Sequence, residues 1–242
     1  MFKRTLTFVF IIVMLLAFAG VQAQDAIEYG QSVSAEMTAS DYEFRYTFSG
    51  NAGDVVIIRM DPVDIFGDLD NPVLLLLGEA GLIADTNDSF SFGDALLAAE
   101  LSAGGEYTVV ATREDGIAGD SVGEFTVEMV LAEELTADKA LSGTATSDER
   151  PQYYIVNSSD AFGVRYEKKG GDLATQINVN TLDADSGGLN EIAVMSGSDL
   201  EVGLLGIFDS GSVYIVTVGE APFDFNFDTV TADFELSLVI AE

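Results

Sequence analysis

The 242-residue chain contains no cysteine, no histidine and no tryptophan. Without cysteine, no disulfide can hold the fold together and no lipid can be attached through a cysteine. Without histidine, the Ser-His-Asp and Cys-His types of catalysis are excluded, as are zinc sites that use histidine. The lack of tryptophan also argues against sugar rings stacked on an exposed aromatic strip.

Basic residues are scarce, with 10 lysines and arginines against 41 aspartates and glutamates, so the net charge is −31. Such a field repels nucleic acid and anionic lipid and favours cations and basic partners. The hydrophobic content of 48% nevertheless supports a packed core. A disordered acidic segment would be much poorer in large apolar residues. We therefore expect a folded protein without a nucleic-acid partner.

Residues 1–23 have the features of a signal peptide. Lys3 and Arg4 begin it, the stretch 6–20 is almost entirely apolar, and Val21-Gln22-Ala23 fits a signal-peptidase site. A retained membrane anchor is the weaker interpretation, because no basic flank follows. Without these residues, 8 basic side chains face 41 acidic ones, a net charge of −33. We expect a secreted or cell-surface protein whose mature chain does not span a membrane.

The remainder of the sequence repeats at a spacing of about 107 residues. Tyr46 returns as Tyr153, Arg59 returns as Arg165, GEYTVVA returns as SVYIVTV, and EFTVEMVLAEE returns as DFELSLVIAE. The matches keep their order along the chain. They predict two domains of one fold, residues 24–134 and 135–242, which touch at a short polar boundary.

The pattern within each repeat is that of β-strands. Residues 42–48 alternate apolar with polar, and short β-branched runs such as 55–58 end at turn residues. Helical patterning is thin, although residues 94–101 could form one turn of helix. The fold class we predict is all-β: two tandem antiparallel β-sandwiches of jelly-roll type.

The first repeat resembles the bacterial pre-peptidase C-terminal domain, a β-sandwich found on exported proteins. The resemblance rests on ordered motifs: Tyr46-Thr47-Phe48 before Asn51-Ala52-Gly53-Asp54, then Asp70-Asn71-Pro72, Asn87-Asp88, residues 101–109, and Gly123-Glu124-Phe125. The second repeat resembles it as a diverged copy that lacks the Asn-Pro and Asn-Asp elements. The resemblance implies a non-catalytic module. Some members of the family bind calcium, and some bind extracellular polymers such as collagen.

Two groups of acids flank the apolar run 73–77. Calcium prefers six to eight oxygen ligands, which carboxylates and amides supply. If residues 78–81 turn the chain back into a second strand, Asp68 and Asp70 come beside Asp85 and Asp88. These four aspartates are our candidate calcium ligands in the first domain. The alternative is that they are solvated turn residues, since a chain with 41 acids clusters them by chance.

Two further motifs have simpler structural interpretations. Asp185-Ser186-Gly187 and Asp209-Ser210-Gly211 resemble the turn of an aspartic protease, but they lie 24 residues apart within one repeat rather than on two symmetric halves. Turns between strands are favoured over catalysis. The alternating stretch 223–228, with three phenylalanines, is favoured as a strand with one core face over an exposed binding strip.

Together these features favour a non-enzymatic exported module that binds an extracellular polymer or protein, with calcium as a candidate stabilising ion. One alternative is a self-assembling subunit of a surface layer or matrix. Another is a hydrolase that uses carboxylates alone, either a glycosidase or an aspartic-type protease. That alternative requires a pair of acids in a cleft, one of them with a raised pKa.

Overall fold

The computed structural model describes residues 25–64, 67–69, 71–86, 94–147, 150–182, 188–197, 200–221 and 229–241. The predicted signal peptide lies outside these residues, so its cleavage stays a prediction. The described part of the chain contains no helix with the length and hydrophobicity of a membrane span.

The first sandwich consists of a five-stranded and a four-stranded sheet, in the orders β1-β3-β8-β5-β6 and β2-β9-β4-β7. A short 3-10 helix, η1 (Gly116–Ala118), follows β8. The strands are β1 (Asp25–Ala26), β2 (Gln31–Met37), β3 (Glu43–Gly50), β4 (Val55–Pro62), β5 (Pro72–Gly78), β6 (Gly81–Thr86), β7 (Ala95–Glu100), β8 (Gly105–Arg113) and β9 (Gly123–Leu131).

The second sandwich has the same construction, with sheets ordered β10-β12-β17-β14-β15 and β11-β18-β13-β16. Each strand therefore has a counterpart nine places earlier. The strands are β10 (Glu133–Glu134), β11 (Leu141–Thr146), β12 (Gln152–Asn157), β13 (Phe162–Gly171), β14 (Thr175–Leu182), β15 (Leu189–Gly197), β16 (Val202–Phe208), β17 (Val213–Glu220) and β18 (Thr231–Ile240).

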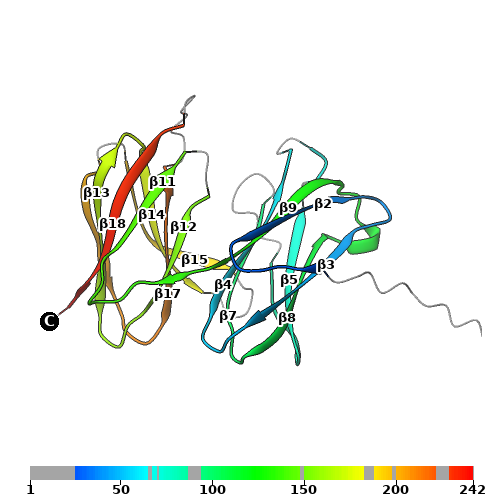
Figure 1. Cartoon of the computed structure of the whole chain (residues 1–242), viewed down its shortest axis with the longest axis horizontal. Coiled ribbons are helices and arrows are strands. Elements are labelled where there is room, and N and C mark those ends of the chain that lie inside the picture. Colours follow the sequence, from blue (N-terminus) through cyan, green and yellow to red (C-terminus); the bar gives the residue numbers. More distant parts are fainter. Residues whose placement is uncertain are drawn as a thin grey trace, which may run out of the picture.

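The predicted fold class is thus confirmed: the chain is all-β and forms two sandwiches side by side (Figure 1). One detail departs from an antiparallel plan. The two-residue strands β1 and β10 pair in parallel with β3 and β12 at the edges of the five-stranded sheets. All other strand pairs in the sheets are antiparallel.

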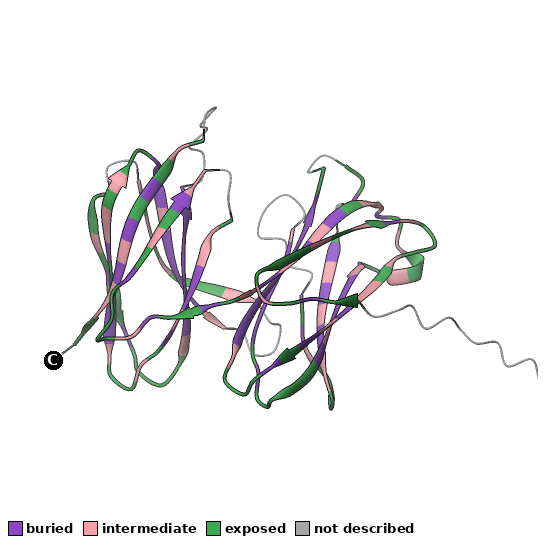
Figure 2. Ribbon diagram, viewed as in Figure 1, coloured by how far each residue is buried: buried purple, intermediate pink, exposed green. Residues whose placement is uncertain are grey.

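The apolar run 73–77 lies in β5 and forms the predicted hairpin with β6. Gly78 pairs with Gly81 across the turn, and Leu75 pairs with Asp85. Leu74 and Leu76 are fully buried in the core, whereas the alternate side chains are half-buried on the outer face. Figure 2 shows this alternation of buried and exposed residues along many strands.

The expected turn of helix at 94–101 is wrong, because residues 95–100 form strand β7. Alanine and leucine suit a helix in isolation, but tertiary packing overrides that preference. Leu97 faces the core of the first sandwich, and Leu96 packs between the two sandwiches. A strand covered on both faces shows no alternation, and that explains why its sequence did not look like a strand.

The two sandwiches pack through the outer faces of two sheets. The four-stranded sheet of the first presents Val55, Ile57 and Leu96, and the five-stranded sheet of the second presents Tyr153 and Ile215. These side chains form a third apolar cluster in addition to the two sandwich cores. Only Ala132 separates the end of β9 from the start of β10.

Strand pairing also corrects the register of the repeat. Tyr46 lies opposite Val109 and next to the β1 residue Asp25, and Tyr154 occupies the corresponding place opposite Val216. The counterpart of Tyr46 is therefore Tyr154 rather than Tyr153. This one-residue shift matters because it turns Tyr153 out of its own core and towards the first sandwich.

Candidate functional site: a polar cavity between the sandwiches

Strand β4 carries two charged side chains on an otherwise apolar strand. Arg59 and Asp61 are two residues apart, so both point outward from the first sandwich towards the second. Asp61 is 2% exposed. A buried charge requires partners, and those of Arg59 and Asp61 come from both sandwiches.

Arg59 lies at the centre of this polar group. Its Nη2 is 3.1 Å from Oδ1 of Asp61 and 3.3 Å from Oδ2 of Asp94, which precedes β7. Its Nη1 donates a hydrogen bond of 3.2 Å to the hydroxyl of Tyr153 in the second sandwich. From the same side, Arg150 places Nη2 2.8 Å from Oδ2 of Asp61. Two arginines and two aspartates therefore connect the sandwiches with balanced formal charge.

Burial sets the proton affinities in this group. Burial, followed by the neighbouring Asp61, raises the pKa of Asp94 to about 6, although Arg59 and Arg150 act to lower it. Burial also raises the pKa of Tyr153, although Arg59 opposes this shift. For Arg59, burial lowers the pKa, but Tyr153 and Asp61 outweigh it, and the pKa is raised. The arginine thus stays charged, and Tyr153 stays a neutral hydroxyl at physiological pH.

A cavity of about 260 Å³ borders these side chains. Its walls include Arg59, Asp94 and Leu96 from the first sandwich and Tyr153, Asn178 and Asn180 from the second. Asn178 and Asn180 are 9% and 1% exposed, and the side-chain oxygen of each has no hydrogen-bond partner. The Nε of Arg59 is also buried without a partner. Buried polar atoms are almost always hydrogen-bonded, so these three unpaired atoms, on residues that line the cavity, make it the candidate site.

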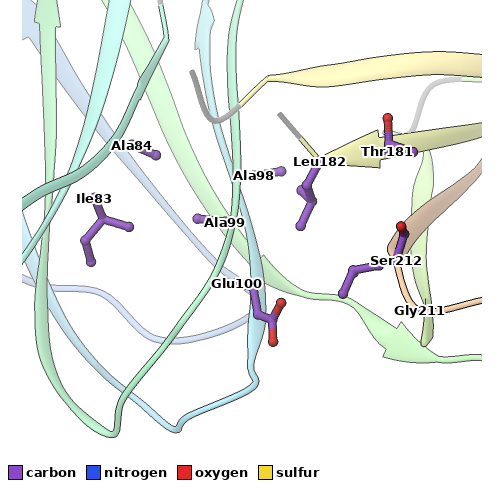
Figure 3. A pocket seen from close by; sticks show the side chains of 10 residues that line it. Ile83, Ala84, Ala98, Ala99, Glu100, Thr181, Leu182, Gly211 and Ser212 are labelled. Atoms are coloured by element: carbon purple, nitrogen blue, oxygen red, sulfur yellow. The ribbon is translucent and has the colours of Figure 1, made fainter. Parts of the chain in front are cut away.

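A second cavity, of about 480 Å³, lies at the same seam (Figure 3). Ala98, Ala99 and Glu100 of β7 face Leu182 and the Gly211-Ser212 turn across it. The described side chains here are mostly small, and none has a buried polar atom without a partner. It therefore gives no chemical indication of an occupant.

The predicted calcium ligands are divided between described and undescribed residues. Asp85 is an exposed residue of β6, and Asp68 is exposed in the loop before β5, where its carbonyl oxygen accepts a hydrogen bond from Val122. Asp70 and Asp88 lie outside the described residues. Within the part that the structure describes, no three carboxylates are grouped closely enough to hold a metal ion. The calcium site stays a prediction.

The remaining motifs have the following outcomes. Asp209-Ser210-Gly211 is the turn between β16 and β17, and the hydroxyl of Tyr214 donates to the carbonyl oxygen of Asp209. Tyr107 makes the matching bond to Ala103 in the first sandwich, so a turn role accounts for this triplet. Asp185-Ser186-Gly187 and the stretch 223–228 lie outside the described residues.

Comparison with known proteins gives only coarse likenesses. No protein-family model matches the chain, and no curated protein matches it. Among solved structures, the pre-peptidase C-terminal domain of a collagenase from Bacillus anthracis is similar at 13% identity and a TM-score of 0.37, covering 45% of this chain and 95% of that one.

Tandem CBM51 modules of Sp3GH98, a family 98 glycoside hydrolase from Streptococcus pneumoniae, are similar at 7% identity and a TM-score of 0.26, covering 85% of this chain and 84% of theirs. The M60 catalytic domain with two CBM51 domains of ZmpB from Clostridium perfringens is similar at 12% identity and a TM-score of 0.30, covering 87% of this chain and 34% of that one. The chain is a pair of β-sandwiches by its own strand order, and these similarities assign it to no family.

Proposed function

We propose that the protein is an exported, non-catalytic binding module that holds a hydroxyl-bearing unit of an extracellular polymer, such as one sugar residue, in the cavity between its sandwiches. The unpaired oxygens of Asn178 and Asn180 carry this proposal. An unsatisfied buried polar group costs about 1–3 kcal/mol, so the cavity gains most from an occupant that donates hydrogen bonds.

The charges around the cavity favour a neutral ligand. Arg59 and Arg150 are both paired with Asp61, and Arg59 also contacts Asp94. Each arginine and carboxylate among the described residues that line the cavity is therefore already in an ion pair. A hydroxyl group, which both donates and accepts, can satisfy an amide oxygen and the Nε of Arg59 together.

The size of the cavity limits what enters it. At about 260 Å³ it is slightly smaller than typical ligand sites, which enclose roughly 300–1,000 Å³. It therefore suits one small unit rather than a long oligomer. Leu96 and Tyr153 supply apolar wall on either side of the polar atoms. Recognition would rest on hydrogen bonds, in keeping with a sequence that has no tryptophan.

A carboxylate-only hydrolase is the second candidate, and one observation favours it: Asp94 has a raised pKa beside Asp61. Two features oppose it. Both oxygens of Asp61 are already bound by arginines, and its side chain is only 3% exposed. The carboxyls of Asp61 and Asp94 also contact each other, whereas those of glycosidases stand roughly 5–9.5 Å apart with substrate or water between them.

The first test is whether insoluble extracellular polysaccharides bind the purified chain. For each polysaccharide that does, the affinity of its oligosaccharides for the chain is then measured by calorimetric titration. Replacing Asn178 and Asn180 with leucine fills the cavity with groups that cannot hydrogen-bond. We expect the double variant to lose roughly 5- to 150-fold in affinity, because each of two bonds to a ligand is worth about 0.5–1.5 kcal/mol.

Asn157→Leu is the matched control, because Asn157 is an exposed residue at the end of β12. It should bind like the unmodified chain. Equal binding by the double variant would overturn the cavity as the binding site. The polysaccharide recovered after incubation is also checked for shortened chains. Shortening by the unmodified chain but not by Asp94→Asn would favour the hydrolase instead.

A further inference from the structure

Strand β16 forms an open edge of the second sandwich. It ends its four-stranded sheet, and among the strands that the structure describes only β13 pairs with it. Lys168 of β13 donates its backbone N–H to the carbonyl oxygen of Glu201. Bonded and non-bonded positions alternate in an antiparallel pair, so residues 203 and 205 also bond towards β13. The N–H and C=O groups of Val202 and Leu204 therefore point to the open edge.

These edge groups are free within the described part of the chain, where no backbone hydrogen bond outside the β13 pairing reaches residues 202 or 204. The regular part of the edge ends soon after them. Leu205 pairs with Val164 and Phe208 with Phe162, so two residues of β16 lie opposite one residue of β13 at a bulge. Two residues with four backbone groups are thus available in regular strand geometry.

The side chains along this edge are apolar and exposed. Val202 is 56% exposed, Leu204 is 57% exposed, and Ile207 at the bulge is 73% exposed. The strand, VGLLGIF, has no charged residue and no proline. Natural edge strands often carry such residues, because they prevent pairing with another chain. The edge strands β2 and β11 have serine, threonine or glutamate at alternate positions, so β16 lacks a protection that these strands have.

Free backbone groups in a strand are matched by another extended backbone. A peptide segment that adds to this edge would bond to residues 202 and 204 through its own N–H and C=O groups. Every second side chain of the segment would then lie beside Val202 and Leu204 on the exposed face. β-branched residues suit these places, because they favour the strand conformation and pack well against neighbouring strands.

Acidic residues at both ends of β16 indicate the charge of the segment. Glu201 precedes the strand and Asp209 follows it, and both are exposed. Neither forms an ion pair with a described basic residue. Antiparallel pairing of β16 with β16 of a second copy would set Glu201 near Asp209 at each end, where like charges repel. A strand with basic ends fits this edge better than a second copy does.

We propose that β16 binds an extended segment of a partner protein, which adds to the four-stranded sheet as a new edge strand. The segment has alternate β-branched residues between basic ends, and it spans residues 201–209. None of the described residues that line the internal cavity belongs to β16, so the inference does not depend on the ligand proposed there.

The probe is the synthetic peptide Lys-Val-Thr-Val-Thr-Val-Thr-Val-Lys with blocked ends and a fluorescent label. The peptide is kept dilute, so that it does not pair with itself, while the purified full chain is titrated. Fluorescence anisotropy should show saturable binding. The same peptide with glutamate in place of both lysines should bind much more weakly, because its ends would repel the acids of β16.

Two methylated peptides test whether the backbone makes the contact. Methylation of the backbone nitrogens of all valines removes one alternate set of N–H donors, and methylation of all threonines removes the other set. Only one set faces β16 when the peptide is a strand. One methylated peptide should therefore lose binding and the other should retain it.

Variants of the chain locate the binding site. Glu201→Gln combined with Asp209→Asn should weaken binding roughly 2- to 30-fold, as expected for the loss of two exposed ion pairs. The matched control is Asp120→Asn combined with Asp138→Asn, which removes two exposed acids away from β16. This control should bind like the unmodified chain.

Leu204→Pro removes an N–H that the pairing with β13 does not use, and its ring blocks the open edge. It should abolish measurable binding, whereas Leu204→Thr, which keeps the N–H, should still bind. If circular dichroism shows that Leu204→Pro is unfolded, the methylated peptides decide the question without any variant.

The absence of saturable binding by the lysine-ended peptide would overturn the proposal. So would equal binding by the two methylated peptides, or unchanged binding by a folded Leu204→Pro variant. Dimers of the unmodified chain that Leu204→Pro dissociates would also overturn it, because a second copy would then occupy the edge.

Discussion

At the scale of single residues, the buried arginine Arg59 organises the contact between the sandwiches. Its sequence neighbourhood contains a recognisable signal: an arginine and an aspartate two residues apart in the apolar strand 55–62. Such a pair must share a face of the strand. The sequence prediction used Arg59 only as a marker of the repeat and did not connect it with Asp61, so it missed their joint role. Their partners Tyr153 and Arg150 lie about 90 residues away, which no local pattern can reveal.

The raised pKa of Asp94 makes a prediction about stability and pH. Its pKa is 3.8 in an ordinary environment and about 6 in the folded chain. The folded state therefore binds this proton more tightly, so the stabilising contribution is complete below pH 3.8 and is lost as the pH rises through 6. Asp94→Asn cannot ionise. We expect this variant to melt at a higher temperature than the unmodified chain at pH 7.5, with a much smaller gain at pH 4.5.

Differential scanning calorimetry at the two pH values measures this difference. Asp41→Asn is the control, because it removes a carboxylate that is exposed rather than buried. A gain for Asp94→Asn that is the same at both pH values would contradict the assigned cause.

At the scale of elements, alternation of apolar and polar residues correctly predicted a strand with one solvent-facing side at residues 42–48. Residues 42–48 and the hairpin around Gly78 and Gly81 follow the predicted pattern. Strand β7 did not, because the second sandwich covers its outer face. The candidate site lies on such doubly covered strands, and the same tertiary contact that builds the cavity therefore hides it from the sequence.

The end of β13 contains a glycine that the fold requires. Gly171 has φ of +85°, and a Cβ there would lie 2.1 Å from the backbone oxygen of Thr231. Its neighbour Gly170 has only a side-chain atom of Asp233, 3.9 Å away. Because backbone cannot yield as a flexible side chain can, Gly171→Ala should cost about 2–4 kcal/mol of unfolding free energy or prevent folding.

Gly170→Ala is the adjacent control and should change the stability by less than about 1 kcal/mol. Urea unfolding followed by circular dichroism measures both variants. Equal stability losses would show that the local backbone adapts freely at the bulge between Lys168 and Gly170.

At the scale of the whole molecule, the net charge dominates the response to ions. With 41 acids and 10 basic residues, self-repulsion opposes the compact state, so added salt should raise the melting temperature. Screening depends only on ionic strength. If the predicted calcium site exists at Asp68, Asp70, Asp85 and Asp88, millimolar calcium should stabilise the chain more than magnesium at the same ionic strength.

Thermal melts in sodium, magnesium and calcium chloride at matched ionic strength separate these two effects. Asp85→Asn tests the site, and Asp138→Asn, an exposed acid in the second sandwich, corrects for the lost charge. Identical melting temperatures in calcium and magnesium would remove the site and leave screening alone.

The single residue between β9 and β10 has a consequence for selectivity. Ala132 gives the chain too little slack for one sandwich to swing away from the other, and it is itself part of the apolar seam. The distance between the cavity walls on the two sandwiches is therefore fixed. We therefore expect the proposed site to select ligands by size, admitting a unit that fits and excluding one that is a few atoms larger.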